Sequence, residues 1–358
     1  MKTLLLFILL LSLIVVVHEF GHFITAKLFN VYVQEFSLGM GPKLWSKKGK
    51  ETEYCLRALP IGGFVAIAGD NSDSKIETQV DTTNIPKERC LDGIHPIKRI
   101  VIMMAGIIMN MFLAVFIVSM IYLSFGNVID SGKPIAEVVQ EGYPAYEAGM
   151  KNGDLIKRIT LKNGYSISPN NYEEYNTFML VYDGKDPITF TVEREGKKID
   201  LEIMPNYDEE TGRYLIGIYM PERTVVETNI FNCWKYGFKY LINIVKITLV
   251  SIAGLFRGVG VESLSGPVGV YEATEQAIQV DFTTYLCLIA ILSINIGLVN
   301  ALPLPILDGG RIVFVIYEWV TKKKISKKAE GMAMQISAIV LIGLVILVTL
   351  KDLGILVW

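Results

Sequence analysis

Four long apolar stretches limit the folds that this sequence can adopt. Residues 4–17 (LLLFILLLSLIVVV) are apolar except for Ser12, and residues 100–126 contain no charged side chain. Residues 285–302 are also free of charge, and residues 331–350 form a fourth apolar stretch. About 20 apolar residues in a helix cross the hydrocarbon core of a bilayer. The sequence therefore predicts an α-helical multi-pass membrane protein with about four transmembrane helices.

The first stretch has a second interpretation. With Lys2 in front of it, it resembles the apolar core of a secretory signal peptide. No small-residue cleavage site follows, however, and the helical pattern continues through HEFGHFITAKLF. A span over residues 4–26 is therefore the favoured prediction, and it places the polar residues of HEFGH at membrane depth.

Composition agrees with the membrane class, since 51% of the 358 residues are hydrophobic and only 20% are charged. The net charge of −2 gives no reason to expect a nucleic-acid partner. The four cysteines share no metal-ligand or redox spacing and are predicted to be unpaired. The lipid bilayer and other membrane proteins are the expected partners, and nothing in the sequence indicates an oligomeric state.

The distribution of lysine and arginine predicts the orientation of the chain. Eleven of these residues lie from Lys27 to Arg99 and six lie from Arg311 to Lys328, whereas only Lys2 precedes the first span. Cytoplasmic loops are rich in Lys and Arg. Both basic segments are therefore predicted to be cytoplasmic, with both termini outside.

Four regions follow from these patterns. They are an N-terminal membrane part (1–126), an extracytoplasmic α+β domain (127–225), an amphipathic interfacial segment (226–283) and a C-terminal membrane part (284–358).

Within these regions, short β-like runs with glycine punctuation over residues 31–70 predict hairpins at the membrane edge, followed by a polar loop over 71–90. Residues 187–205 predict a two-stranded hairpin with Glu195 and Gly196 in its turn.

Residues 231–262 are apolar but carry four basic residues, Lys235, Lys239, Lys246 and Arg257. This pattern favours an amphipathic helix that lies on the membrane. A span here is the alternative, but it would put the two basic segments on opposite sides of the membrane.

Two of the three histidines fall in one pentapeptide, His18-Glu19-Phe20-Gly21-His22, which has the pattern H-E-x-x-H. Residues four apart lie on one helix face, so both imidazoles can bind one Zn²⁺, and the glutamate can take a proton from a zinc-bound water. Ionisable groups at membrane depth are costly and usually functional. The alternative, a polar cluster that hydrogen-bonds between helices, leaves three costly groups without an evident partner.

A catalytic zinc usually has three protein ligands, and the predicted third ligand is Asp308 in ALPLPILDGGRIVF. Pro303 and Pro305 break the third span before it, and Gly309 and Gly310 follow it. Non-helical backbone at membrane depth is tolerated only inside protein or along a watery cavity, and a carboxylate there needs a cation. The alternative is that the aspartate caps the following helix.

The predicted spans and their ends carry further polar residues. Asn110 and Asn295 are as compatible with hydrogen bonds between helices as with a catalytic role. Asn300 precedes the two prolines and is predicted to bind substrate backbone or a developing oxyanion, which makes it a second candidate catalytic residue beside Glu19. His95 is predicted to be an interfacial loop residue and a poor ligand.

These motifs, in this order, resemble the site-2 protease family (peptidase M50) of intramembrane zinc metalloproteases, and within it the bacterial regulator of sigma-E protease type. HEFGH matches the first family motif, residues 300–309 match N-x-x-P-x-P-x-x-D-G, and SGPVG at 265–269 matches a segment before the third span. Residues 141–160 resemble the start of a PDZ domain. Two departures are that residues 105–107 read A-G-I where the family favours A-G-P, and that one PDZ-like domain fits where the best-known relatives carry two.

The resemblance implies that His18, His22 and Asp308 bind Zn²⁺ and that Glu19 is the catalytic base. It also implies that residues 127–225 form a PDZ-like domain that excludes substrates with bulky ectodomains. The expected location is the bacterial inner membrane, with the PDZ-like domain outside and the active site opening toward the cytoplasm.

The predicted function is therefore that of a zinc-dependent endopeptidase that cuts in or near the transmembrane segments of single-span membrane proteins, such as anti-sigma factors or signal-peptide remnants. A helical substrate must unwind before it is cut, and residues 52–67 are predicted to accept it as an added β-strand. A catalytically inactive scaffold with PDZ-type peptide binding is one alternative, although such a protein is expected to lack Glu19 or a ligand. A metal transporter is the other, and it would line several spans with polar ligands.

Overall fold

The computed structural model describes residues 2–70, 84–130, 132–162, 164–182, 184–209, 212–220, 224–255 and 265–355. Most of the predicted loop over 71–90 and the end of the predicted amphipathic segment, including Arg257, lie outside the described residues. The chain forms two compact units, which are treated separately below. The first holds residues 1–121, 237–245 and 263–358, and the second holds residues 122–236 and 246–262.

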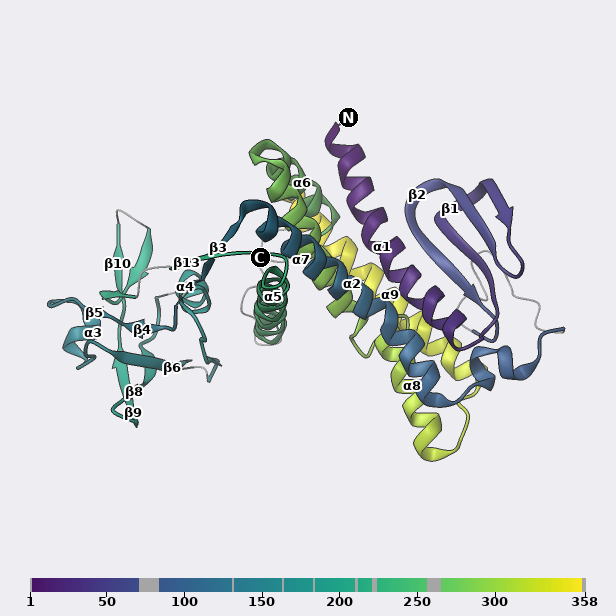
Figure 1. Cartoon of the computed structure of the whole chain (residues 1–358). Helices are drawn as coiled ribbons and strands as arrows, with labels where there is room; N and C mark the ends of the chain where they lie inside the picture. The colour runs from purple at the N-terminus through teal and green to yellow at the C-terminus, as the bar shows by residue number, and fades with distance from the viewer. Residues whose placement is uncertain are drawn as a thin grey trace. The chain divides into compact units, whose positions relative to one another are not determined.

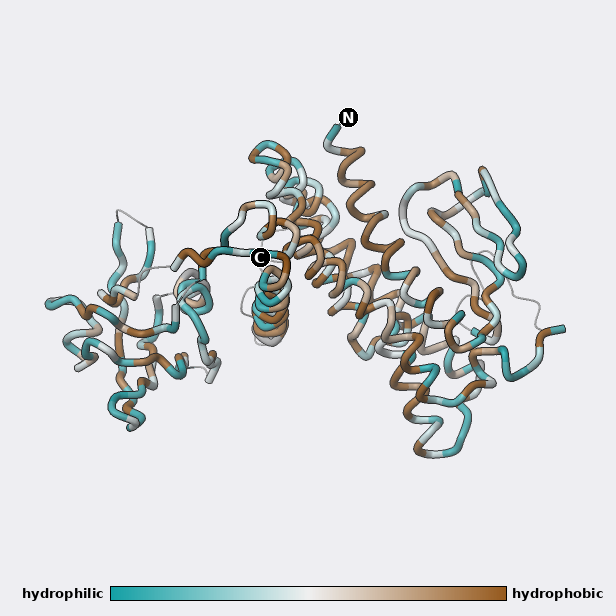
Figure 2. The backbone as a smooth tube through the Cα atoms, in the orientation of Figure 1, coloured by the Kyte–Doolittle hydropathy of each residue, from teal (hydrophilic) through white to brown (hydrophobic). Residues whose placement is uncertain are grey.

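Four of the described helices are long and apolar enough to cross a membrane. They are α1 (Lys2–Leu28), α2 (Pro96–Phe125), α7 (Phe282–Asn300) and α9 (Lys327–Asp352). Figure 2 shows their tubes as largely hydrophobic along their length. The chain is thus a multi-pass membrane protein, as its apolar stretches predicted.

The third apolar stretch ends where its prolines begin. Helix α7 stops at Asn300, and a short non-helical segment carrying Pro303 and Pro305 leads into α8 (Asp308–Thr321). Proline lacks a backbone N–H and clashes with the preceding turn, which explains the break. Helix α6 (Pro267–Val280) precedes α7, and the Tyr285 hydroxyl at the start of α7 donates to the carbonyl of Leu6 in α1 at 2.9 Å.

Strands β1 (Val33–Lys48) and β2 (Glu53–Ile67) bend so strongly that they behave as four paired segments (Figure 1). Residues 35–38 of β1 pair with residues 53–56 of β2 on one side and with residues 63–66 on the other. Gly39, Gly41 and Gly62 have positive φ where the strands bend, a conformation that other residues rarely adopt. Short 3₁₀ turns over Lys87–Arg89 and Leu91–Gly93 then lead into α2.

The second unit contains an antiparallel sheet with strand order β4-β6-β8-β9 and a short β7 paired with β6. These strands are β4 (Ile135–Ala136), β6 (Asp154–Leu161), β7 (Ser166–Ile167), β8 (Ile188–Arg194) and β9 (Lys197–Ile203). Glu195 and Gly196, both with positive φ, join β8 to β9. Ile156, Ile159 and Phe190 of the sheet pack with Phe178 of α4 (Tyr172–Val181) in one core.

The remaining elements of this unit are short. Helix α3 (Pro144–Glu147) follows β5 (Val138–Val139) in the chain. Three two-stranded pairings complete the unit, namely β3 (Asn127–Asp130) with β13 (Thr224–Glu227), β5 with β12 (Ile218–Tyr219), and β10 (Asn206–Asp208) with β11 (Arg213–Leu215). Helix α5 (Cys233–Leu255), of which residues 237–245 belong to the first unit, covers most of the segment 231–262 predicted to be amphipathic and is not among the four apolar helices of the described chain.

Candidate metal centre

Two imidazoles and one carboxylate meet inside the membrane unit. His18 and His22 lie one turn apart on α1, and Asp308 is the first residue of α8. Oδ2 of Asp308 is 3.0 Å from Nε2 of His18 and 3.3 Å from Nε2 of His22, and the two Nε2 atoms are 3.1 Å apart. All three residues are largely shielded from solvent. Three ligand atoms that converge from two elements could hold one metal ion, and two histidines with a carboxylate are a common catalytic zinc set.

The environment of His22 favours this use. Its Nδ1 lies 2.8 Å from the carbonyl oxygen of Ile102 on α2, and only an N–H at Nδ1 can donate to that oxygen. A neutral imidazole has a single N–H, so Nε2 keeps the lone pair that a metal requires. Such a hydrogen bond fixes the tautomer and the ring orientation of metal-binding histidines.

Glycines let the helices come close enough to build this cluster. A Cβ placed on Gly106 of α2 would lie 2.6 Å from Nε2 of His22 and 2.7 Å from Nε2 of His18. A Cβ on Gly21 of α1 would lie 2.4 Å from the carbonyl oxygen of Ala105. The backbone of α2 therefore lies directly against the two imidazoles, and α2 continues through the A-G-I sequence as a helix. The sequence had pointed to residues 105–107 only as a departure from the family motif, so it gave no sign that Gly106 contacts the histidines.

The two glycines after Asp308 have an equivalent role in α8. A Cβ on Gly309 would lie 2.2 Å from the carbonyl oxygen of Ala301, and a Cβ on Gly310 would lie 2.2 Å from that of Leu304. The start of α8 therefore packs tightly on this loop. Arg311, three residues after Asp308, forms an ion pair with Asp70 at the end of the β1–β2 region.

The helix-cap alternative for Asp308 does not describe this geometry. The N-cap residue of α8 is Leu307, and no side chain caps the helix. The carboxylate of Asp308 is instead turned toward the two histidines.

The other candidate residues occupy different positions. Glu19 lies beside His18 on α1 and is half-buried, and an ideal Cβ on Gly63 of β2 would be 3.9 Å from its Cγ. Asn300 ends α7 and is half-buried, and its side chain forms no hydrogen bond with another described residue. His95 is exposed just before α2 and is not part of the His18, His22 and Asp308 group.

A second group of potential ligand atoms lies in the β1–β2 region and is a poor metal site. It consists of Glu35, Glu53 and Cys55. Nζ of Lys43 already lies 3.0 Å from the Glu35 carboxylate and 2.8 Å from that of Glu53, and it holds the pKa of Glu53 below its ordinary value. Burial and the neighbouring Glu35 raise the pKa of the Cys55 thiol to about 11, so it stays protonated. Arg57 also pairs with Glu35, at 2.8 Å. Both carboxylates of the group therefore already have cationic partners.

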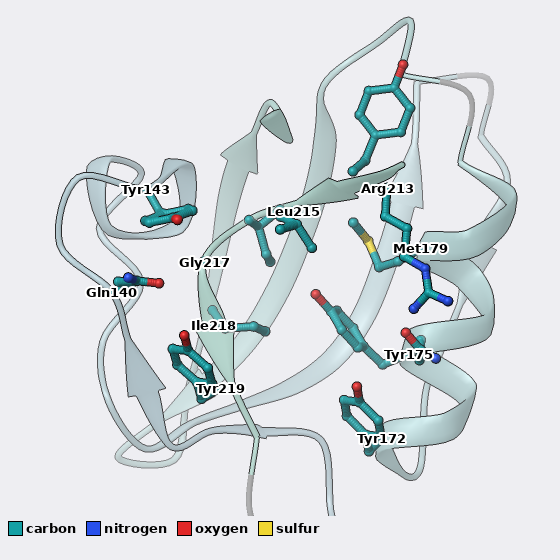
Figure 3. Close-up of a pocket in the computed structure, with 13 residues that line it drawn as sticks. Gln140, Tyr143, Tyr172, Tyr175, Met179, Arg213, Leu215, Gly217, Ile218 and Tyr219 are labelled. Carbon is teal, nitrogen blue, oxygen red and sulfur yellow. The ribbon is translucent and has the colours of Figure 1, made fainter. Parts of the chain in front are cut away.

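The second unit carries a groove of about 250 Å³ between α4 and the segment 213–219 (Figure 3). Tyrosines dominate its wall, among them Tyr143, Tyr172 and Tyr175. In Figure 3, Tyr175 points from α4 into the space that faces β11 and β12. Arg213 is the only charged residue among those that line the groove.

The fold and the cluster together define a class of protein, namely a multi-pass membrane protein in which two histidines and one carboxylate, a set that could hold a metal ion, meet between the helices. Comparison with known proteins gives the family. Residues 6–344 match the model of Peptidase family M50, so the chain belongs to this family of zinc metalloproteases.

Relatives agree with this assignment. A protein of Clostridium acetobutylicum with a zinc-metalloprotease name is 32% identical over 349 residues, which cover 96% of this chain and 95% of the relative. A Fusobacterium nucleatum protein with the same kind of name is 33% identical, with 98% of both chains covered. The protease Eep of Enterococcus faecalis is 30% identical, with 99% of both chains covered. Zn²⁺ is accordingly the cofactor of this protein.

Proposed function

We propose that this protein is an intramembrane zinc endopeptidase that cuts single-span membrane proteins in or beside their transmembrane segments. The observation that carries the proposal is the convergence of His18, His22 and Asp308 between apolar helices in a chain of this family. In this proposal these three residues hold Zn²⁺. No other polar group in the described spans offers the ion a comparable set of ligands.

Glu19 is the proposed general base. Zinc bound to these ligands would lower the pKa of a water molecule to about 7 and so supply a nucleophile at neutral pH. Glu19 lies next to a ligand on the same helix, where its carboxylate can take the proton of the attacking water and pass it to the leaving amine. Asn300, at the end of α7, is the proposed partner for a substrate carbonyl or for the developing oxyanion.

The bent β1–β2 region supports a route for the substrate. A helical substrate hides its peptide bonds in its own hydrogen bonds, so it must unwind before hydrolysis. Residues 63–66 of β2 pair with β1 on one side, and Gly63 lies beside Glu19. Within the predicted acceptor segment 52–67, an unwound substrate added as a strand beside residues 63–66 would regain backbone hydrogen bonds next to the proposed base.

The remaining features of the proposal concern topology and substrate choice. The basic loops favour an active site that opens toward the cytoplasm of a bacterial cell, with residues 127–225 on the outer face of the inner membrane. We propose that this region is a PDZ-like domain that excludes substrates with bulky ectodomains. Substrates of the kind expected are anti-sigma factors or signal-peptide remnants.

The decisive test uses purified full-length protein in detergent and a model substrate with one transmembrane segment. Glu19→Gln should keep bound zinc at the wild-type stoichiometry but abolish cleavage. Asp308→Ala should lose both zinc and cleavage, and Asp308→Asn should weaken both, since a neutral amide is a poorer ligand than a carboxylate.

Three results would count against the proposal. Near wild-type cleavage by Glu19→Gln would remove the base assignment. Full activity in Asp308→Asn would show that the charge of the carboxylate is not needed to hold the metal. Zinc-bound wild-type protein that cuts no transmembrane substrate would favour a non-catalytic scaffold.

A further inference from the structure

Asn110 lies on α2 one turn after Gly106 and therefore on the same helix face. It is completely buried. Its Nδ2 lies 3.4 Å from Nδ1 of His18, and its Oδ1 has no hydrogen-bond partner among the described residues. An unpaired buried polar atom costs about 1–3 kcal/mol, so a buried amide at this position calls for an explanation.

The metal-binding role of His18 supplies one. Nε2 of His18 is the atom that faces Asp308 and His22, so Nε2 must carry the lone pair. The single proton of the neutral ring then sits on Nδ1, which becomes a hydrogen-bond donor. An amide nitrogen facing that N–H would set two donors against each other. With the amide turned over, Oδ1 of Asn110 accepts the Nδ1–H, and Nδ2 takes the position that has no partner among the described residues. The orientation of an amide is assigned from its hydrogen bonds, and here the N–H of His18 decides it.

We propose that Asn110 is a positioning residue for the zinc centre, and that its Oδ1 accepts the Nδ1–H of His18 and thereby holds Nε2 toward the metal. It does for His18 what the carbonyl oxygen of Ile102 does for His22. Each ligand histidine on α1 is thus oriented by an acceptor on α2. The inference rests on the proposed function, because it presupposes that His18 is a zinc ligand.

The contact between helices at this point uses other atoms of the same residue. The hydroxyl of Ser293 on α7 donates to the backbone carbonyl of Asn110 at 2.9 Å. A Cβ on Gly297 would lie 3.4 Å from Cβ of Asn110, so α7 packs directly on this residue. The backbone of Asn110 thus accounts for the attachment of α7, and the amide remains available to the histidine. Helix-helix attachment alone therefore does not explain why the side chain is an amide.

The test measures zinc affinity of the purified full-length protein by competition with a chelator, together with thermal unfolding. Asn110→Ala removes the acceptor without adding atoms and should weaken zinc binding about 10–100-fold, the usual effect of losing such a partner. Asn110→Asp keeps an oxygen acceptor and should bind zinc at least as tightly as Asn. Ser119→Ala is the matched control, because Ser119 is also completely buried on α2 and its hydroxyl has no partner in the described chain. Its zinc affinity should stay at the wild-type value.

Wild-type zinc affinity in Asn110→Ala would overturn the inference. So would an equal loss in Asn110→Asp and Asn110→Ala, because packing and not acceptance would then explain the residue. Zinc affinity that stays at the wild-type value in Asn110→Asp but falls in Asn110→Ala is a result that a purely structural role does not produce. A wild-type protein that binds no zinc would instead remove the proposed function itself, so the two failures are distinguishable.

Discussion

Gly106 offers the most direct test of how the zinc centre is built. Replacement by Ala would place a methyl carbon 2.6 Å from Nε2 of His22 and 2.7 Å from Nε2 of His18. Ordinary contacts of a Cβ begin at 3.4 Å, so the overlap is about 0.8 Å, and it falls on the two atoms proposed to bind zinc. Because α2 is in backbone contact with α1 at Gly21, it cannot simply move away. Overpacking of this kind costs about 1–3 kcal/mol.

If that cost falls on the metal-bound state, zinc affinity should drop about 5–140-fold, since each 1.4 kcal/mol is a factor of ten. Chelator competition on purified protein measures the drop, and cleavage of a transmembrane substrate should fall with it. Gly343→Ala is the matched control, because this glycine also lies in a spanning helix but an added Cβ meets nothing within 4 Å. The control should bind zinc normally. A Gly106→Ala protein with wild-type zinc affinity would refute the view that α2 lies against the imidazoles.

Three further predictions concern topology and the second unit. A cysteine at Lys198 should react with an impermeant thiol reagent outside intact cells, whereas one at Lys323 should not, and reversed labelling would overturn the orientation. Deletion of 130–222 should permit cleavage of substrates that retain their ectodomains. If the deleted protein cuts trimmed substrates but not these, the PDZ-like domain does not exclude substrates with bulky ectodomains. Burial acts to raise the pKa of Asp154, but its 2.6 Å pair with Arg194 outweighs this and keeps the pKa below its ordinary value. The pair therefore stabilises the unit above the ordinary carboxyl pKa and is lost as pH falls through the lowered one, and Asp154→Asn should reduce the free energy of unfolding at pH 7 by about 1.5–3 kcal/mol. An unchanged unfolding curve at pH 7 would show that the pair contributes nothing.

Much of the membrane architecture could be predicted from the amino-acid sequence. Hydropathy depends only on residue type and length, so the four long apolar helices fall on the four apolar stretches. The break before Asp308 was also predictable, because two prolines cannot continue a helix. The hairpin turn at Glu195 and Gly196 was predictable for the same kind of local reason.

The packing around the metal centre was less accessible to sequence reasoning. Asn110 was as compatible with attachment between helices as with a role at the site, and Gly106 stood out only as part of an unusual motif. A glycine or asparagine in an apolar helix has many possible neighbours. Only the position and rotation of α2 against α1 show that these two residues meet the imidazoles of His18 and His22.

Three properties follow from the residues alone: the chain crosses the membrane, two histidines share a helix face, and a carboxylate follows a broken helix. Each of these properties is local, since it depends on a few neighbouring residues and the helical repeat. The meeting of Asp308 with His22, which are 286 residues apart (308 − 22), is not local. It required α1, α2, α7 and α8 to pack at distances that Gly21, Gly106, Gly309 and Gly310 permit, and only the tertiary structure decides such distances, because they depend on every side chain in the contact at once.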